Sequence, residues 1–225
     1  MPTILITGAN RGIGQALATS YQAAGWKVYA ARRYGGAVVP EGTHPVRLDV
    51  GDEHSIKALK DQLGDEPIDV LWNNAGVFLD KGKDLAKLPD EDWLESFRVN
   101  CVAPIRLAEM LIDNVAASDR RVMAFTSTKM ASLARYGQGS IAYRSSKTAL
   151  NMAVRCLSHD VAPRGISCIM LHPGWVKTDM GGEAADIDVE TSVSGMRKTV
   201  DQAGPGQQAD YNGRFFDYDG SAIDW

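Results

Sequence analysis

Tyr143 and Lys147 are the residues whose types and spacing point most directly to chemistry. They stand four positions apart in Ser140–Leu150, a segment whose composition favours a helix. Side chains at positions i and i+4 lie on the same face of a helix, so the phenol and the ammonium can serve one site. Such a pair also arises by chance, and it is then only part of a solvated helix face. The elements around the pair decide between these interpretations.

The composition is that of an ordinary globular protein. The chain has 225 residues, 44% of them hydrophobic and 23% charged, which suits a single α/β domain over residues 1–225. The net charge of −4 gives no reason to expect nucleic acid or an anionic membrane as a partner. No apolar run reaches spanning length and no basic leader precedes the first strand pattern, so we expect a soluble, cytoplasmic protein. The spacing of Cys101, Cys156 and Cys168 predicts neither a metal site nor a disulfide framework.

Short apolar strands alternate with helical segments along the chain. Strands are predicted at residues 3–7, 27–32, 46–50, 68–72, 121–126, 166–171 and 214–217, and helices at 15–24, 52–63, 90–116 and 141–161. Within the third helix, Pro104 predicts a break or kink near Ala103. Alternation of this kind implies right-handed crossovers. The sequence therefore predicts a Rossmann-type, doubly wound parallel sheet of about seven strands.

A glycine-rich turn, Gly8-x-x-x-Gly12-x-Gly14, joins the first strand to the first helix. Such a turn places backbone N–H groups at a helix N-terminus, where the helix dipole favours a phosphate. The spacing differs from the common G-x-G-x-x-G fingerprint, and glycines also serve tight turns that bind nothing. The position directly after a buried strand favours nucleotide binding. The residues expected to hold the cofactor here are Gly8, Asn10, Arg11, Gly12, Ile13 and Gly14.

The end of the second strand bears on the choice of cofactor. An acidic residue there would accept bonds from a ribose 2′-hydroxyl, but this chain has Arg32 and Arg33. Their guanidinium groups could fork onto a 2′-phosphate, with Arg11 adding a third positive charge. Alternatively, these arginines are only solvent-exposed residues at the edge of a loop and bind no ligand. We favour NADP(H) and keep NAD(H) as the alternative, and we expect Asp49 and Val50, at the third strand's end, to meet the adenine.

Four motifs that occur in order make the chain resemble a known family. They are Thr7–Gly14, Asn73-Asn74-Ala75-Gly76, Tyr143-x-x-x-Lys147 and Pro173-Gly174. Together they resemble the short-chain dehydrogenase/reductase family over Thr3 to Met180. Residues 142–147, 172–182 and 215–220 also look like the branch typified by sniffer carbonyl reductase and the C-factor proteins. That similarity extends nearly to Trp225.

The resemblance implies that Tyr143 and Lys147 are catalytic. An ammonium about 4 Å from a phenolate, at an effective dielectric constant near 20, is worth about 4 kcal/mol. This would lower the pKa of the phenol from about 10 to about 7. Such a phenol can protonate the alkoxide that forms when hydride reaches a carbonyl carbon. In the family, Lys147 would also hold the hydroxyls of the nicotinamide ribose.

The resemblance assigns two further catalytic roles. Ser127, just past the fifth strand, would hydrogen-bond the carbonyl oxygen of the substrate. Its distance in sequence from Tyr143 is longer than is usual in the family, which implies an insertion within residues 132–139 and leaves Ser132 as the alternative serine. Asn100 matches the family asparagine that holds a water linking the lysine to solvent.

Further contacts of the cofactor also follow from the resemblance. Asn74, Ala75 and Gly76, in the segment that starts at Asn73, would close over the adenine ribose. Pro173, Gly174 and Val176 would face the nicotinamide, and Thr178 would reach its amide or the pyrophosphate. Residues 176–206 would cover the substrate.

The function that these expectations favour is an NADPH-dependent carbonyl reductase acting on a small aldehyde or ketone, or on the corresponding alcohol. Family members are commonly homo-oligomers, so a dimer or tetramer is expected. Two alternatives stay open: a nucleotide-binding signalling or sensor protein with little turnover, and an NAD(H)-linked alcohol dehydrogenase.

Overall fold

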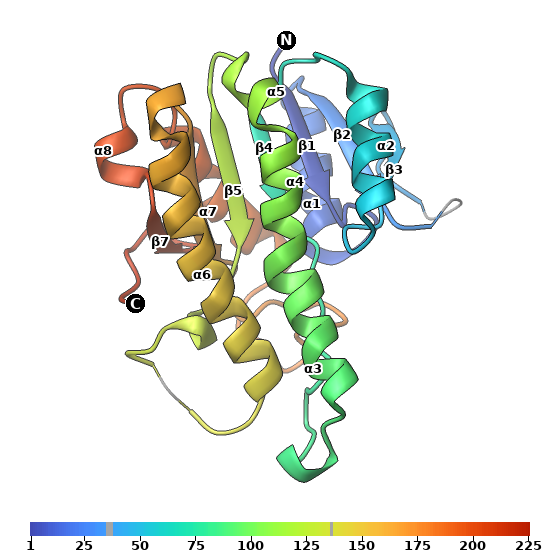
Figure 1. Ribbon diagram of the computed structural model, residues 1–225, viewed down its shortest axis with the longest axis vertical. Coiled ribbons are helices and arrows are strands. Elements are labelled where there is room, and N and C mark those ends of the chain that lie inside the picture. The colour runs from blue at the N-terminus through green and yellow to red at the C-terminus, as the bar shows by residue number, and fades with distance from the viewer. Residues whose placement is uncertain (35–37, 136) are drawn as a thin grey trace.

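The structure is a computed structural model that describes residues 1–34, 38–135 and 137–225 (Figure 1). Residue 136 of the expected insertion lies outside the described residues. The strands are β1 (Thr3–Thr7), β2 (Lys27–Arg32), β3 (His44–Arg47), β4 (Val70–Asn73), β5 (Val122–Thr126), β6 (Ser167–His172) and β7 (Arg214–Asp217). The helices are α1 (Gly12–Ala23), α2 (Glu53–Leu63), α3 (Asp90–Phe97), α4 (Ala103–Met110), α5 (Ile112–Ala116), α6 (Ile141–Val161), α7 (Val189–Gln202) and α8 (Gln208–Tyr211).

The described strands form one seven-stranded sheet in the order β3-β2-β1-β4-β5-β6-β7, and every pairing is parallel. The chain winds outward from β1 to β3, then returns to β4 beside β1 and winds to the opposite edge. The predicted doubly wound parallel sheet is thus confirmed. The direction in which the chain winds across the sheet reverses between β1 and β4. Ligands bind outside the carboxyl ends of the strands at such a point.

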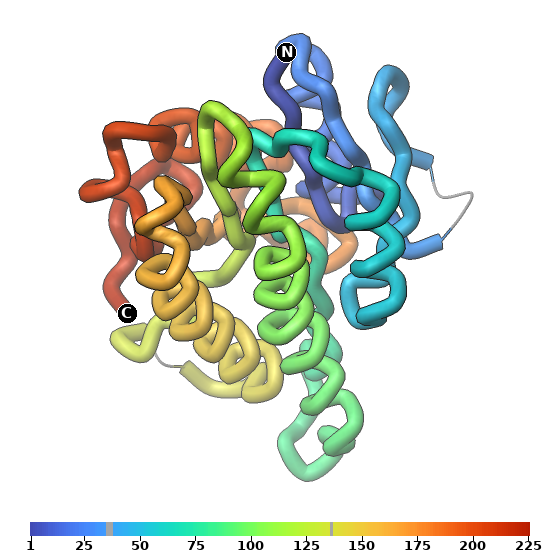
Figure 2. The backbone as a smooth tube through the Cα atoms, turned by 45° about the horizontal axis from the view of Figure 1, so that its top comes forward, coloured from blue at the N-terminus to red at the C-terminus, as the bar shows by residue number. Residues whose placement is uncertain are grey.

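Helices cover both faces of the sheet. On the face in front in Figure 1, α2, α4, α5 and α6 pack over one core cluster; α1 and α7 cover the other face (Figures 1 and 2). Strand β1 shows how the sequence supplies both cores: Leu5 belongs to the first cluster, Ile4 and Ile6 to the second. Because successive side chains of a strand point to opposite faces, a strand buried on both faces must be apolar throughout.

The third strand begins earlier than predicted. It spans His44–Arg47, so Asp49 and Val50 lie beyond its end and not within it. The physical reason is a local turn: the amide of Gly51 donates to Asp49 Oδ1 over 3.0 Å, and the amide of Asp49 donates to Ser55 Oγ over 2.9 Å. Such side-chain bonds compete with the hydrogen-bond ladder of a sheet.

Pro104 disturbs the long helix without interrupting it. A single π turn, Arg98–Val102, connects α3 to α4, and the proline sits in the first turn of α4. The π turn widens the helix where the proline lacks an amide donor, so a bulge takes the place of the predicted break. Asn100 lies in the middle of this turn.

Candidate active site

A cavity of about 330 Å³ opens at the carboxyl ends of the central strands. Its volume is within the range of pockets that bind small molecules. Most of the predicted site residues line it, namely Gly8, Asn10, Arg11, Gly12, Ile13, Gly14, Arg33, Asp49, Val50, Asn74, Ala75, Gly76, Ser127, Tyr143, Lys147, Pro173 and Thr178. The fold thus brings together residues from motifs far apart in the sequence.

The glycine turn forms a cradle at one side of the cavity. Gly8 and Gly12 have φ of +66° and +51°, a region that glycine enters at little cost. A Cβ on Gly14 would overlap the carbonyl oxygen of Gly8 and would approach Asn74 Nδ2 to 2.6 Å, so only glycine allows this packing. At the start of α1, no described side chain caps the first amides of the helix. This N-terminus therefore suits a phosphate, and the cradle fits a dinucleotide.

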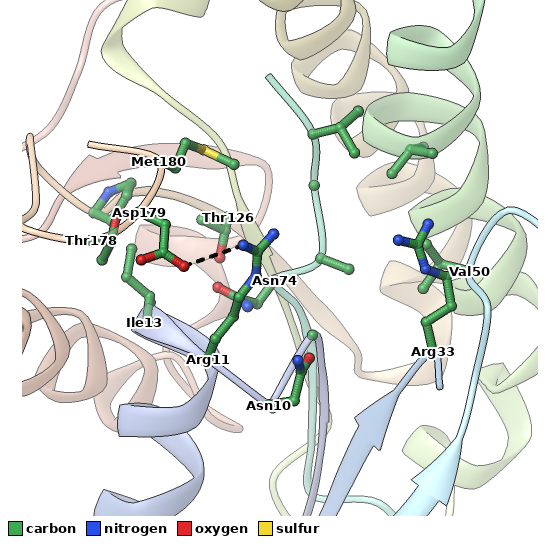
Figure 3. A pocket seen from close by; sticks show the side chains of 18 of the residues that line it. Asn10, Arg11, Ile13, Arg33, Val50, Asn74, Thr126, Thr178, Asp179 and Met180 are labelled. Atoms are coloured by element: carbon green, nitrogen blue, oxygen red, sulfur yellow. Dashed lines mark hydrogen bonds and ion pairs between the residues drawn. The ribbon is translucent and has the colours of Figure 1, made fainter. Parts of the chain in front are cut away.

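The two predicted arginines at the end of β2 differ in position. Arg33 lines the cavity, across the cleft from Arg11 (Figure 3), and its guanidinium packs over the ring of Tyr34 at 4.6 Å. Arg32 is not among the described lining residues; its backbone lies in register with that of Arg47 in β3. Successive side chains at a strand end point in opposite directions, which explains why only one of the two faces the cleft.

Arg11 forms an ion pair that the sequence did not predict. Its Nη1 lies 3.3 Å from Asp179 Oδ2, in the segment that follows β6 (Figure 3). Both side chains are largely exposed, at 68% and 82%, so this pair is worth under about 1 kcal/mol. Lys81 Nζ also donates to the carbonyl oxygen of Met180 over 2.6 Å. Together these contacts tie the Asp179–Met180 segment of the cavity lining to the glycine turn and to the loop after β4.

Lys147 is almost completely buried, at 4% exposed. Its Nζ donates to the backbone carbonyl oxygen of Thr126, at the end of β5, over 2.8 Å. Burial lowers the pKa of the ammonium to about 8, opposed by the nearby Cys101 thiol. One hydrogen bond of the Lys147 ammonium is therefore made to the protein's own backbone.

The pKa of Tyr143 shifts in the direction opposite to our expectation. Burial raises it to about 12, opposed by a hydrogen bond with the hydroxyl of Thr128. The ring stacks on Phe78, with centroids 4.1 Å apart and planes 13° from parallel. The predicted fall to about 7 is therefore wrong for the protein's own environment. The physical reason is that burial dominates, while the Lys147 ammonium is bonded to Thr126.

Ser127, and not the alternative Ser132, lines the cavity. Ser127 Oγ donates to Asn151 Oδ1 over 2.6 Å, whereas we expected this proton to face the substrate. Asn151 Nδ2 is buried and has no partner among the described residues. A half-turn of the amide would let Nδ2 donate to Ser127 Oγ and would free the serine proton. Asn151 stands eight positions after Tyr143 on α6, so helical spacing could have indicated it.

Three more predicted residues lie outside the described lining: Asn100, Gly174 and Val176. Asn100 is fully buried; its Oδ1 accepts from the amide of Val77 over 2.9 Å, and its Nδ2 donates to the carbonyl of Val77 over 2.9 Å. Its side chain thus fixes the loop after β4. Val176 forms a β-bridge with Ile187, which buries it behind the cavity wall.

Eight further lining residues had not been named individually as cofactor or catalytic residues, although four of them lie in the segment 176–206 that was expected to cover the substrate. They are Leu48, Val77, Val99, Thr126, Lys177, Asp179, Met180 and Val189. Most adjoin a predicted residue by one or two positions. Val99 directly precedes Asn100, and Val189 lies in the segment 176–206 that was expected to cover the substrate.

Among the described residues, no group of histidine, cysteine and acidic side chains is arranged to hold a metal ion. Within the same ranges, no helix is long and apolar enough to cross a membrane.

The fold and the cavity define a Rossmann-type protein with a candidate nucleotide site. The chain belongs to the short-chain dehydrogenase family of oxidoreductases: the family model for short chain dehydrogenase matches residues 2–188. The C-signal protein of Myxococcus xanthus is 41% identical over 163 residues, which cover 71% of this chain and 93% of that protein.

Solved structures agree with this assignment. The carbonyl reductase Sniffer of D. melanogaster superposes with a TM-score of 0.86 at 30% identity, over 100% of both chains. A carbonyl reductase of Pseudomonas aeruginosa PAO1 in complex with NADP gives a TM-score of 0.86 at 34% identity, also over 100% of both chains. The family and the branch predicted from the motifs are thus confirmed.

Proposed function

We propose that this protein is an NADPH-dependent carbonyl reductase that acts on small aldehydes or ketones. The observation that carries the proposal is that Ser127, Tyr143 and Lys147 line the same cavity as the glycine turn. The reaction needs three parts: a group that holds the carbonyl oxygen, a proton donor, and a turn that binds the phosphates of the cofactor. The similarity to the two carbonyl reductases supports the same conclusion.

The residues of the cavity fit NADP(H). The N-terminus of α1 would hold the pyrophosphate, and Arg33 with Arg11 would hold the 2′-phosphate. The carboxylate of Asp49 would accept from the adenine amino group, and Lys147 would bind the nicotinamide ribose. The NADP complex of the Pseudomonas reductase supports this choice of cofactor. NAD(H) remains the alternative that a binding measurement decides.

Tyr143 would act as the general acid. With a pKa of about 12 its phenol is protonated at neutral pH, so it can donate a proton to an oxygen on which negative charge develops. When bound, NADPH would supply the hydride that reaches the carbonyl carbon. Ser127 would orient the carbonyl oxygen toward the phenol.

An activity measurement tests this function. Purified protein is mixed with NADPH and a panel of aldehydes and ketones, and the loss of NADPH absorbance is followed. Tyr143→Phe should lower kcat on the order of 10²- to 10⁴-fold. Tyr211→Phe is the matched control, because that tyrosine bonds Gln202 at the surface, away from the cavity. Equal turnover by Tyr143→Phe and wild type would exclude this mechanism.

A signalling role is the second candidate, and the similarity to the Myxococcus C-signal favours it. In that case the protein binds NADPH without turnover of any carbonyl in the panel. A partner protein would then bind it in a manner that depends on the nucleotide. We also propose a homodimer or homotetramer, which light scattering of the purified protein tests.

A further inference from the structure

Asp80 is a buried carboxylate that our account of the cavity has not used. It lies in the loop between β4 and α3 and is 2% exposed. No lysine or arginine of the described residues forms an ion pair with it. Burying an unpaired charge is costly, so its environment must supply compensating bonds.

Those bonds come from the first turn of α6, the helix that carries Tyr143. Asp80 Oδ2 accepts from the amide of Ala142 over 2.8 Å, and Oδ1 accepts from the amide of Tyr143 over 3.3 Å. A carboxylate at this end of a helix also gains from the dipole. Asp80 therefore caps α6 from a position 62 residues earlier in the chain.

The helix has no local substitute for this cap. Ser140, which precedes α6, has φ of +54° and ψ of +41°, and its side chain makes no capping bond within the described chain. An N-cap residue normally adopts an extended backbone and caps its own helix. Here the cap fixes the end of α6 to the loop after β4.

The same loop also holds the ring of Tyr143. Phe78 stacks on it, and the neighbouring Val77 is bonded to Asn100 through both its amide and its carbonyl. The backbone and the ring of Tyr143 are therefore both held by residues 77–80. Because Asn100 anchors this loop to the π turn, the phenol has a fixed place in the cavity.

We propose that Asp80 is a positioning residue that sets the place of the Tyr143 phenol by capping α6 from outside the helix. This rests on the proposed function only in that Tyr143 is the proton donor. Proton transfer needs hydrogen-bond distance, and a displacement of 1 Å can cost about 10²-fold in rate. Asp80→Ala should therefore lower kcat about 10- to 100-fold and leave the dissociation constant for NADPH within about twofold.

Two variants and a matched control test this role. Asp80→Asn keeps one acceptor oxygen, so its kcat should fall between those of wild type and Asp80→Ala. If the alanine variant does not fold, the asparagine variant alone tests the proposal. Asp52→Ala is the control, because Asp52 is the N-cap residue of α2 and accepts from the amide of His54, so the substitution removes a helix cap that has no contact with Tyr143. It should lower thermal stability and leave kcat unchanged. An equal loss of kcat in Asp52→Ala, or none in either Asp80 variant, would overturn the proposal.

A second measurement does not depend on turnover. Stacking on Phe78 should move the ring signals of Tyr143 upfield in spectra of protein with ¹³C-labelled tyrosine, and Tyr143→Phe assigns them. We expect the Asp80 variants to lose this shift and Asp52→Ala to keep it. If the shift depends on Asp80 while the wild type reduces no carbonyl, the positioning stands and the proposed function fails. An unchanged shift in both Asp80 variants rejects the positioning role, whatever their kcat.

Discussion

The ammonium of Lys147 donates a hydrogen bond to the backbone carbonyl oxygen of Thr126, with Nζ and O 2.8 Å apart. This bond joins the N-terminal third of α6 to the end of β5 and holds a buried charge in the lining of the cavity. Its cost is visible in the pKa of Lys147, which burial lowers to about 8 from 10.5. The protein keeps a charge that is unfavourable for folding at the place where the proposed reaction needs one.

Replacing this charge should therefore stabilise the fold. The lowered pKa corresponds to about 3 kcal/mol, and the lost hydrogen bond to Thr126 returns about 1 kcal/mol. We expect Lys147→Met to raise the free energy of unfolding at pH 7 by about 2 kcal/mol, with loss of carbonyl reduction. Urea unfolding of both proteins measures this.

The difference in the free energy of unfolding between wild type and Lys147→Met should also depend on pH, and the lowered pKa fixes the sign of this dependence. Between pH 8 and 10.5 the unfolded chain holds the Lys147 proton more often than the folded chain, so wild type gains stability relative to Lys147→Met as pH rises. The advantage of Lys147→Met should fall to zero below pH 10.5 and then reverse, because the bond to Thr126 still favours wild type after the cost of the charge is gone. A difference that stays constant from pH 7 to 10.5 would contradict the assigned shift.

Arg33 should discriminate between NADPH and NADH. A charge-assisted bond to the 2′-phosphate is worth about 1.5–3 kcal/mol, so Arg33→Ala should weaken NADPH binding about 10- to 100-fold. NADH binding should be unchanged. Calorimetric titration with each nucleotide measures both constants.

Arg32→Ala is the matched comparison for this experiment, because Arg32 adjoins Arg33 and does not line the cavity. Its effect on NADPH binding should be smaller. A larger effect than that of Arg33→Ala, or a wild type that prefers NADH, would refute the cofactor assignment.

Ser127 and Ser132 can be separated by the same activity assay. Ser127→Ala should lower kcat/KM about 10²-fold, a loss typical for the removal of one oxyanion donor. Ser132→Ala should change it less than twofold, because Ser132 lies outside the cavity lining. Asn151→Ala should fall between them, since Asn151 bonds Ser127 Oγ. The reverse order would move the catalytic serine into the insertion.

Asp179 should weaken the binding of an anionic cofactor. Its carboxylate lines the cavity and pairs with Arg11, so Asp179→Asn should lower the dissociation constant for NADPH about two- to fivefold. The gain should shrink in high salt, which screens exposed charges. Asp186→Asn, an exposed change outside the described lining, is the control and should have no such effect. Weaker NADPH binding by Asp179→Asn would show that the pair supports the site.

The sequence by itself determined the features that depend on local patterns. Apolar runs and helical periodicity placed β2, α6 and β7 at their observed boundaries, and the glycine motif placed a turn between β1 and α1. The four-residue spacing of Tyr143 and Lys147 placed both in one cavity. These predictions succeed because strand alternation and helix geometry act over a few residues.

The tertiary structure alone decided how those residues are held. It caps α6 with Asp80, directs Lys147 to Thr126, and pairs Arg11 with Asp179, a residue 168 positions away. It also placed Arg33, and not Arg32, at the cavity. These contacts depend on the paths of loops between distant elements and on burial, which raised the pKa of Tyr143 where the sequence predicted a fall. Local spacing carries no information about the paths of the loops or about burial, because both arise only when the chain has packed.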